Sequence, residues 1–566
     1  MGMALSRVTF PDSTRMMEAA VAPVTKREPR MLSGPILFIE CTHTYQHDLN
    51  TGIQRVVRNI LRHSTAIAAT YGLQVVPVVL ENGRFLSADA QRVLMDKQRP
   101  TPASSLEPSL VAAPEADPEL PPGPEPSERR PSLMRALWHL ALRVLATLLP
   151  FEGAHRFLYA PPDRFGLAHC LSLKWIPVRR VEADPAPMPE PIQTSIPIVP
   201  DFAEPVSLDE FDDLDGCLLL LLDSSWPTPI WPAVARFKAR GGYVAGVIYD
   251  LIPITHSNSC VSEVSTVFTA WIRNHLSHSD ALVCISRSVA AQLKTFFRSD
   301  VETRAFGDAV PIDHFHLGSE LDLINPVDGI RPEVRAIFEA TGPIFLMVGS
   351  IEPRKNHAYV LDAFDRFWCR GGAATLVIVG RREWKTEAVL ARIAEHRQLG
   401  RQLFILRDLS DLELDHGYRH ASALVMASQI EGFGLPIVEA FQHGLPILCS
   451  DIPVFREIAD RRATFFDLAA PDHLTDAVEN FCRWHDRWNR WICRPRQWLD
   501  RHNDPLSRAL RAPYRAIERR RQARRSQQWL SWRESTEQLI SAVMRRRAPV
   551  ENEPNQDNAP SIQSMA

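Results

Sequence analysis

The chain has 566 residues, a formal net charge of -3 and a sequence pI near 6.7. That length is enough for two α/β domains, because a single hydrophobic core usually stops growing near ~250–300 residues. The near-neutral charge balance gives no global attraction to nucleic acid or to an anionic membrane. Nine cysteines without a C-x-x-C pair fit neither a disulfide scaffold nor a zinc site, so we expect a reducing cytoplasm.

Three segments near the N-terminus are not expected to form a compact core. Residues 1–33 are basic but lack the apolar stretch of a signal peptide, which predicts a disordered leader. Residues 97–131 are rich in proline and acids, and such an insertion cannot bury enough apolar surface to fold. Residues 133–149 predict an amphipathic helix, which either lies in a membrane interface or packs on the protein core. No stretch reaches the ~18–20 apolar residues of a membrane span.

Short apolar runs that end in polar loops recur along the rest of the chain. GPILFIECTH, GCLLLLLDSSW, GGYVAGVIYDLIPITH and SDALVCISRSVAAQL are each typical of a buried strand followed by a loop. With the helical patterns between them, they predict a doubly wound α/β lobe over residues 34–325. GPIFLMVGSIEPRKNH begins a second series of strands and helices, which predicts a second lobe over residues 326–480.

The most informative segment, EGFGLPIVEAF, begins at Glu431. The LVMAS run before it is typical of a buried strand, and Gly432 and Gly434 permit a tight turn. Pro436 suits the first turn of a helix, whose free N–H groups and positive dipole end favour an anion. Glu439 then lies about one turn inside that helix. Eight helical residues span at most ~12 Å, so the two glutamates can hold the two ends of one nucleotide sugar.

This segment, together with the HGLPILCSDIPVFREI run that follows it, resembles the donor-site motif of retaining glycosyltransferases of family 4, also called group 1. The EPRKNH and EGFGLPIVEAF segments are most similar to bacterial polysaccharide mannosyltransferases, and the resemblance is dense over residues 340–460. It implies the GT-B fold, in which two doubly wound Rossmann-like lobes enclose a donor cleft.

Glycosyl transfer must stabilise a diphosphate leaving group, so the site needs fixed positive charge. Arg354 and Lys355 lie at a predicted helix start, and Gly349 lets the backbone approach closely. In the family these two cations form the diphosphate clamp. The first lobe has no clear Asp-x-Asp motif at a strand end, and cations with a helix N-terminus can neutralise phosphates. We therefore expect metal-independent transfer without a cofactor.

By the same resemblance, Glu431 contacts hydroxyls of the transferred sugar and Glu439 contacts those of the ribose. The backbone N–H groups of Phe433, Gly434 and Leu435 would contact the sugar or the phosphates. The predicted catalytic set is Glu431 with the two clamp cations. The sequence leaves open whether Glu431 is a covalent nucleophile or supports a front-face substitution.

Two segments of the first lobe also match the family. Gly52, in NTGIQRVV, resembles the loop that meets the donor phosphates. Tyr249 and Asp250 begin a YDLIP run that is similar to the HDLIP segment of many relatives. Tyr249 stands where the family often has histidine, which weakens an acid/base role there. Both residues remain candidate contacts to the acceptor or to the transferred sugar.

The C-terminal part is expected to add three segments. Residues 481–528 form an extension rich in Arg and Trp, which binds an anionic membrane surface or is a solvated insertion; we expect no nucleic-acid partner. Residues 529–547 resemble the family's closing helix, which packs back toward the first lobe. Residues 548–566 are expected to be disordered.

The sequence thus predicts a retaining hexosyltransferase in the cytoplasm, peripheral on the inner face of the membrane if the basic extension binds lipid. It would move a hexose, with mannose from GDP-mannose favoured, to a glycan or lipid-linked acceptor in surface polysaccharide biosynthesis such as that of lipopolysaccharide. Two alternatives remain: a UDP-sugar-dependent GT-B enzyme, and a catalytically silent GT-B scaffold subunit.

Overall fold

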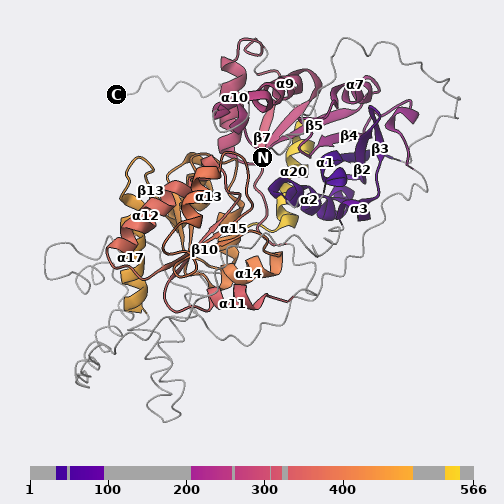
Figure 1. The fold of residues 1–566 in the computed structure, drawn as a ribbon. Coiled ribbons are helices and arrows are strands. Elements are labelled where there is room, and N and C mark those ends of the chain that lie inside the picture. The colour runs from indigo at the N-terminus through magenta and orange to yellow at the C-terminus, as the bar shows by residue number, and fades with distance from the viewer. Residues whose placement is uncertain are drawn as a thin grey trace, which may run out of the picture.

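The computed structural model describes residues 34–47, 51–94, 205–257, 262–305, 308–321, 329–488 and 529–547. These residues form two α/β lobes, each built around its own sheet (Figure 1). Several predictions lie outside the described residues: the leader, the proline-rich insertion, the amphipathic helix at 133–149, the lobe boundary at 325–326, most of the basic extension and the tail.

The first lobe contains a seven-stranded sheet with the order β3-β2-β1-β4-β5-β6-β7. All neighbouring pairs are parallel except β2 with β3. The LLLL run of β4 is at most 1% exposed, as expected of a central strand that is covered on both faces. The strands are β1 (Ile36–Glu40), β2 (Gln74–Glu81), β3 (Arg84–Ser87), β4 (Leu218–Leu221), β5 (Tyr243–Ile248), β6 (Ala281–Cys284) and β7 (Ile312–His314).

Helix α2 (Gly52–Ala68) begins where Thr51 and Gln54 form a capping box. The backbone N–H of Gln54 donates to Thr51 Oγ1 at 3.4 Å, and the backbone N–H of Thr51 donates to Gln54 Oε1 at 3.3 Å. This cap fixes the start of the helix next to Gly52. The other helices of the first lobe are α1 (Thr42–Gln46), α3 (Ala90–Leu94), α7 (Trp231–Ala239), α8 (Ile252–Thr255), α9 (Ser262–His278) and α10 (Arg287–Ser299).

The second lobe contains a six-stranded, fully parallel sheet with the order β10-β9-β8-β11-β12-β13. Its strands are β8 (Ile344–Val348), β9 (Thr375–Val379), β10 (Leu403–Leu406), β11 (Ala423–Met426), β12 (Ile447–Ser450) and β13 (Ala463–Phe466). Its helices are α11 (Pro332–Phe338), α12 (His357–Cys369), α13 (Glu387–Ala394), α14 (Asp411–His420), α15 (Leu435–Gln442), α16 (Pro453–Ala459) and α17 (His473–Trp488). The domain boundary predicted at residue 480 thus falls inside α17.

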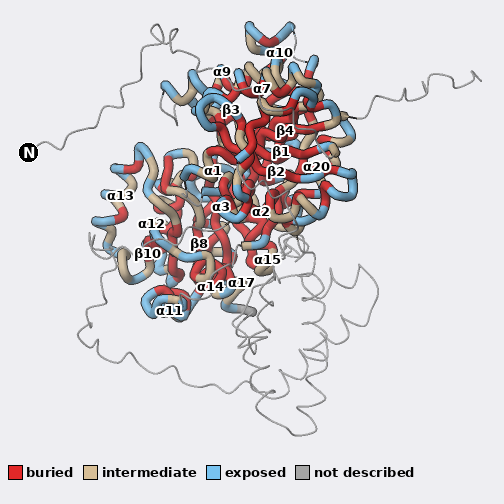
Figure 2. The backbone as a smooth tube through the Cα atoms, turned by 90° about the vertical axis from the view of Figure 1, so that its right-hand side faces the viewer, coloured by how far each residue is buried: buried red, intermediate tan, exposed pale blue. Residues whose placement is uncertain are grey.

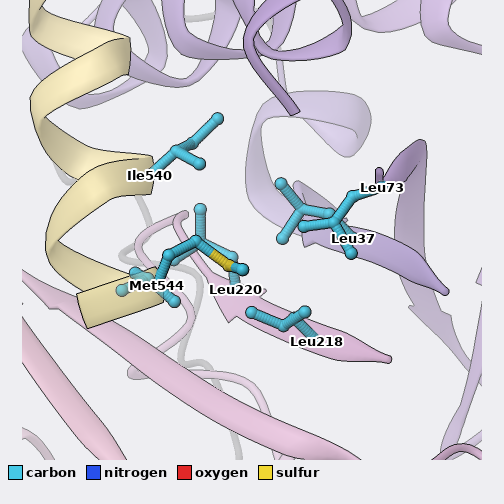
Figure 3. Close-up of a pocket in the computed structure, with 7 residues that line it drawn as sticks. Leu37, Leu73, Leu218, Leu220, Ile540 and Met544 are labelled. Carbon is cyan, nitrogen blue, oxygen red and sulfur yellow. The ribbon is translucent and has the colours of Figure 1, made fainter. Parts of the chain in front are cut away.

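The last described helix, α20 (Trp532–Arg547), follows the second lobe in sequence but lies against the first, beside α2 (Figure 1). Its start is fixed by Trp532, whose backbone N–H donates to Glu320 Oε2 at 2.7 Å. Ile540, Val543 and Met544 close one side of a small apolar cavity over the first sheet (Figure 3), whose other side is lined by Leu37, Leu73, Leu218 and Leu220. The helix therefore covers part of the first lobe's core.

Buried residues form the interior of both lobes (Figure 2). One cluster of buried apolar side chains is continuous from the first lobe to the second and includes Leu251 and Ile437. Two doubly wound sheets, each in its own lobe, confirm the predicted GT-B fold. Within the described ranges, no helix is both long and apolar enough to span a bilayer.

Candidate active site between the lobes

The three residues predicted as catalytic converge in one buried ion cluster. Nζ of Lys355 contacts Oε1 of Glu431, and Nη1 of Arg354 donates to Oε2 of Glu431 at 2.8 Å. The three side chains are only 8% to 19% exposed. Ser428 Oγ donates to Glu431 Oε1 at 2.7 Å, and Nη2 of Arg354 lies 2.6 Å from Oε1 of Glu352. Two cations therefore face two carboxylates.

Charges within this cluster favour the ionised forms of Glu431 and Arg354. Burial alone would raise the pKa of Glu431, but the charges of Lys355 and Arg354 outweigh it, and the pKa falls to about 2. Burial likewise works against the Arg354 guanidinium, yet Glu431 and Glu352 raise its pKa above the usual value. At neutral pH Glu431 and Arg354 are therefore charged, and Glu431 carries no proton to donate, whereas burial raises the pKa of Glu352.

The fold explains why these residues meet. Arg354 and Lys355 lie in a short 3-10 turn (Pro353–Lys355) after β8, and Glu431 lies in the loop after β11. Because β8 and β11 are parallel neighbours, their carboxyl ends share one edge of the sheet. Gly349 lies beneath the clamp, since a Cβ added there would be 3.4 Å from Cε of Lys355.

Glu439 is held apart from this cluster. It lies in α15, which begins at Leu435 as predicted, with Gly434 as N-cap at φ 115° and Pro436 in the first turn. Its Oε2 accepts from the Tyr418 hydroxyl at 2.6 Å. Its Oε1 lies 2.5 Å from Nη1 of Arg55, a residue of the first lobe. Both carboxylate oxygens are thus fixed.

The donor loop of the second lobe touches the first lobe directly. The backbone at Gly432 leaves no room for a side chain, because an added Cβ would lie 2.1 Å from the carbonyl oxygen of Tyr249. The Gly432 carbonyl accepts from Ser286 Oγ at 2.9 Å. A Cβ on Gly52 would be 3.6 Å from Cδ1 of Leu435, so the predicted first-lobe loop also reaches the start of α15.

The other predicted contacts, which are Tyr249, Asp250 and the backbone of residues 433–435, do not belong to the ion cluster of Glu431. The Tyr249 hydroxyl donates to the Leu222 carbonyl at 2.7 Å, so it is used inside the first lobe. Asp250 is partly buried, and burial raises its pKa while the nearby Arg354 charge lowers it. The side chain of Phe433 packs against the rings of His316 and Trp529, at centroid distances of 6.0 and 6.1 Å. Phosphate contacts by the backbone of Phe433, Gly434 and Leu435 stay predictions.

A second junction between the lobes was not predicted. Glu457, in α16, accepts from the backbone N–H groups of Arg287 and Ser288 at 2.7 and 2.8 Å and from His316 Nε2 at 2.8 Å. A carboxylate of the second lobe therefore caps α10 of the first. Burial opposes its ionisation, but these donors lower the pKa of Glu457 to about 2. In sequence it is one glutamate of an ordinary amphipathic helix, which gives no signal of this role.

The first lobe also contains a buried carboxyl pair that the sequence did not single out. Glu40 ends β1 and Asp223 follows the neighbouring β4, and their residues are 0% and 1% exposed. Glu40 Oε1 accepts from the Thr42 amide at 2.8 Å, whereas Oε2 is buried without a partner. Burial, and then the charge of Asp223, raise the pKa of Glu40 to about 7.

This shift predicts a pH dependence of stability. Between about pH 4.5, the usual pKa, and pH 7, the unfolded chain releases the Glu40 proton while the folded chain keeps it. The contribution of Glu40 to the free energy of unfolding is therefore largest below pH 4.5. It falls by roughly 3 kcal/mol as the pH rises from 4.5 through 7, which corresponds to the size of the pKa shift. For Glu40→Gln, the free energy of unfolding measured in urea at pH 5, 6, 7 and 8 should not show this decrease. Glu302→Gln, at a 66% exposed side chain, should keep the wild-type profile, and parallel profiles for all three proteins would contradict the assignment.

Comparison with known proteins connects this geometry to a family. Residues 331–498 match the family model described as Glycosyl transferases group 1. This match covers most of the second lobe and less than a third of the chain. The matched segment includes both the Arg354-Lys355 turn and the loop and helix that carry Glu431 and Glu439. In the second lobe the ion cluster lies at the carboxyl edge of the sheet, where open α/β sheets bind their ligands.

Similar proteins include the serotype-specific mannosyltransferase WbdA of Escherichia coli, which is 36% identical over 246 residues, covering 43% of this chain and 30% of WbdA. The O-antigen chain mannosyltransferase RfbU of Salmonella typhimurium is 31% identical over 155 residues, covering 26% of this chain and 42% of RfbU. The chain thus spans less than a third of the length of WbdA. Among solved structures, Anabaena Alr3699/HepE in complex with UDP covers 60% of this chain and 79% of its own, at 12% identity and a TM-score of 0.40.

Proposed function

We propose that the protein is a retaining glycosyltransferase that moves mannose from GDP-mannose to a glycan or lipid-linked acceptor in surface polysaccharide biosynthesis. The observation that carries this proposal is the buried cluster of Arg354, Lys355 and Glu431 at the carboxyl edge of a lobe that matches the group 1 glycosyltransferase family model. The preference for mannose is supported by the names of the similar proteins, which are mannosyltransferases.

The cluster suits the charge changes of the reaction. As the bond between the sugar and the diphosphate breaks, negative charge grows on the phosphate oxygens, and Arg354 and Lys355 supply fixed positive charge there. Glu431 keeps both cations oriented before the donor arrives, and as an ionised carboxylate it favours positive character at the anomeric carbon. Since the two cations neutralise the leaving group, we propose that transfer needs no metal ion.

Donor binding and turnover test the proposal. Wild-type protein should be stabilised against heat by GDP-mannose and not by UDP-glucose or UDP-N-acetylglucosamine, because binding to the folded state alone raises Tm. It should release GDP, or transfer mannose to a mannose-terminated acceptor, at the same rate with and without EDTA, and the product should keep the α configuration by NMR.

Each other outcome has a defined meaning. Stabilisation and turnover with a UDP-sugar alone would show that the donor is a UDP-sugar and not GDP-mannose. A product with inverted configuration would exclude the retaining mechanism. Binding of no nucleotide sugar would favour a silent scaffold subunit. We further propose that the enzyme acts in the cytoplasm at the inner membrane face, where a lipid-linked acceptor would be. Flotation with anionic vesicles tests this location. Protein that does not float with the vesicles would contradict the membrane association.

A further inference from the structure

The guanidinium of Arg55, in the first lobe, pairs with two carboxylates of the second lobe. Arg55 lies in the first turn of α2 and extends Nη1 to Glu439 Oε1 at 2.5 Å and Nη2 to Asp411 Oδ1 at 3.2 Å. Glu439 belongs to α15, and Asp411 is the first residue of α14. These two carboxylates come from separate βα units of the second lobe, so Arg55 contacts both only when the lobes are closed.

Glu439 is oriented from two directions. The hydroxyl of Tyr418, a residue that is 0% exposed, holds Oε2 from within the second lobe and does so in any arrangement of the lobes. Arg55 holds Oε1 from the first lobe. Two carboxylate oxygens offer about four acceptor positions, so these two donors leave room for further hydroxyl groups. A carboxylate that is fixed but not saturated is suited to accept from a vicinal diol.

The ion pair is shielded from solvent, which makes its contribution larger than that of a surface pair. The side chain of Glu439 is 3% exposed and that of Arg55 is 13% exposed. Charge-assisted hydrogen bonds are short and directional, and water does not compete with a covered pair. The angle of the carboxylate plane therefore depends on the position of α2, which means that it depends on the position of the whole first lobe.

We propose that Arg55 is a positioning residue for the donor, which turns Glu439 to accept the ribose hydroxyls and makes ribose binding depend on closure of the lobes. The ligand class is a nucleoside diphosphate, because the contact acts on the ribose and leaves the phosphates to Arg354 and Lys355. The inference rests on the proposed function. By thermodynamic linkage, the free energy by which lobe closure strengthens ribose binding equals the free energy by which bound ribose favours the closed lobes.

Two ligands separate the ribose contact from the phosphate contact. Wild type and variants are titrated by calorimetry with inorganic pyrophosphate and with GDP, or with UDP if wild type binds only that nucleotide. Arg55→Gln should weaken the nucleoside diphosphate about tenfold, as expected for losing one charge-assisted hydrogen bond, and should leave pyrophosphate within about twofold. Arg55→Lys keeps the charge but not the two-pronged guanidinium, so its affinity for the nucleoside diphosphate should lie between those of wild type and Arg55→Gln.

The same helix supplies a matched control. Arg62, about two turns further along α2, donates to Asn59 at 2.7 Å, and Arg62→Gln should bind both ligands as wild type does. Glu439→Gln should itself weaken the nucleoside diphosphate. Adding Arg55→Gln to Glu439→Gln should then change the affinity by less than about twofold, because Arg55 acts through that carboxylate.

Three results would overturn the inference: unchanged nucleotide affinity in Arg55→Gln even if its Tm falls, equal losses for pyrophosphate and nucleotide, or fully additive losses in the double variant. The first would leave Arg55 as a stabiliser of the interface only. A wild-type protein that binds neither nucleotide would instead contradict the proposed function, so the two failures are distinct.

Discussion

Lys355→Met is expected to lower the rate of transfer, and of donor hydrolysis, by roughly 100- to 1000-fold, the range seen when one preorganised charge donor is removed from an active site. Nζ of Lys355 is the group that contacts Glu431 Oε1, and its stem lies against Gly349 at the end of β8. Methionine keeps the length of the apolar stem and removes the charge. Steady-state assays with the preferred nucleotide sugar measure the effect as a loss of kcat.

Loss of activity through unfolding must be separated from loss of chemistry. The variant leaves Glu431 buried with one cation in place of two, which destabilises the fold. Lys355→Met combined with Glu431→Gln restores the charge balance, so it should recover most of the thermal stability and none of the activity. Lys238→Met breaks the ion pair, at 2.8 Å, with Asp280, which directly precedes β6 at the sheet edge opposite to the carboxyl ends of the strands, and should remain active. Activity returning in the double variant would show that Lys355 serves only the fold.

Gly432→Ala is expected to lower transfer about 100-fold or more without unfolding either lobe. The new Cβ would lie 2.1 Å from the Tyr249 carbonyl oxygen and 3.1 Å from Cβ of Asp250, so the lobes must separate to admit it. A displacement of about 1 Å between reacting groups is enough for a loss of that size. Small-angle scattering should show a more open molecule, and kcat should fall with little change in Tm.

A second glycine provides the comparison. Gly329 has nothing within 4 Å of an added Cβ, so Gly329→Ala should keep wild-type activity and shape. If Gly432→Ala transfers sugar at the wild-type rate, then closure at this contact is not needed for the reaction. A large fall in Tm for Gly432→Ala would instead mean that the lobe interface stabilises the fold.

The convergence of Glu431 with Arg354 and Lys355 was predictable because it depends on local rules. Each residue follows a strand that is identifiable from its apolar run, and the carboxyl ends of neighbouring parallel strands share an edge. The start of α15 was predictable for a similar reason, since Gly434 and Pro436 mark it in sequence. These features need only the order of the strands within one lobe.

The partners of Glu439 and Glu457 were not predictable, because they depend on how two lobes sit against each other. Arg55 lies 384 positions from Glu439, and Ser288 lies 169 positions from Glu457. No periodicity or local motif connects residues at such separations. The one hint was chemical: Arg55 is a charged residue on a helix whose neighbours Val56 and Val57 are buried. Such a residue needs a partner, but the sequence does not say which.

The return of α20 to the first lobe has a consequence for how the chain is made. Ile540, Val543 and Met544 complete an apolar surface of the first lobe, yet they are translated after the entire second lobe. Domains usually fold in order as they leave the ribosome, at about 5–20 residues per second. Here the first lobe would wait roughly 10–45 seconds for its last helix, with Leu37 and Leu220 uncovered. That interval is when the nascent chain would most need a chaperone.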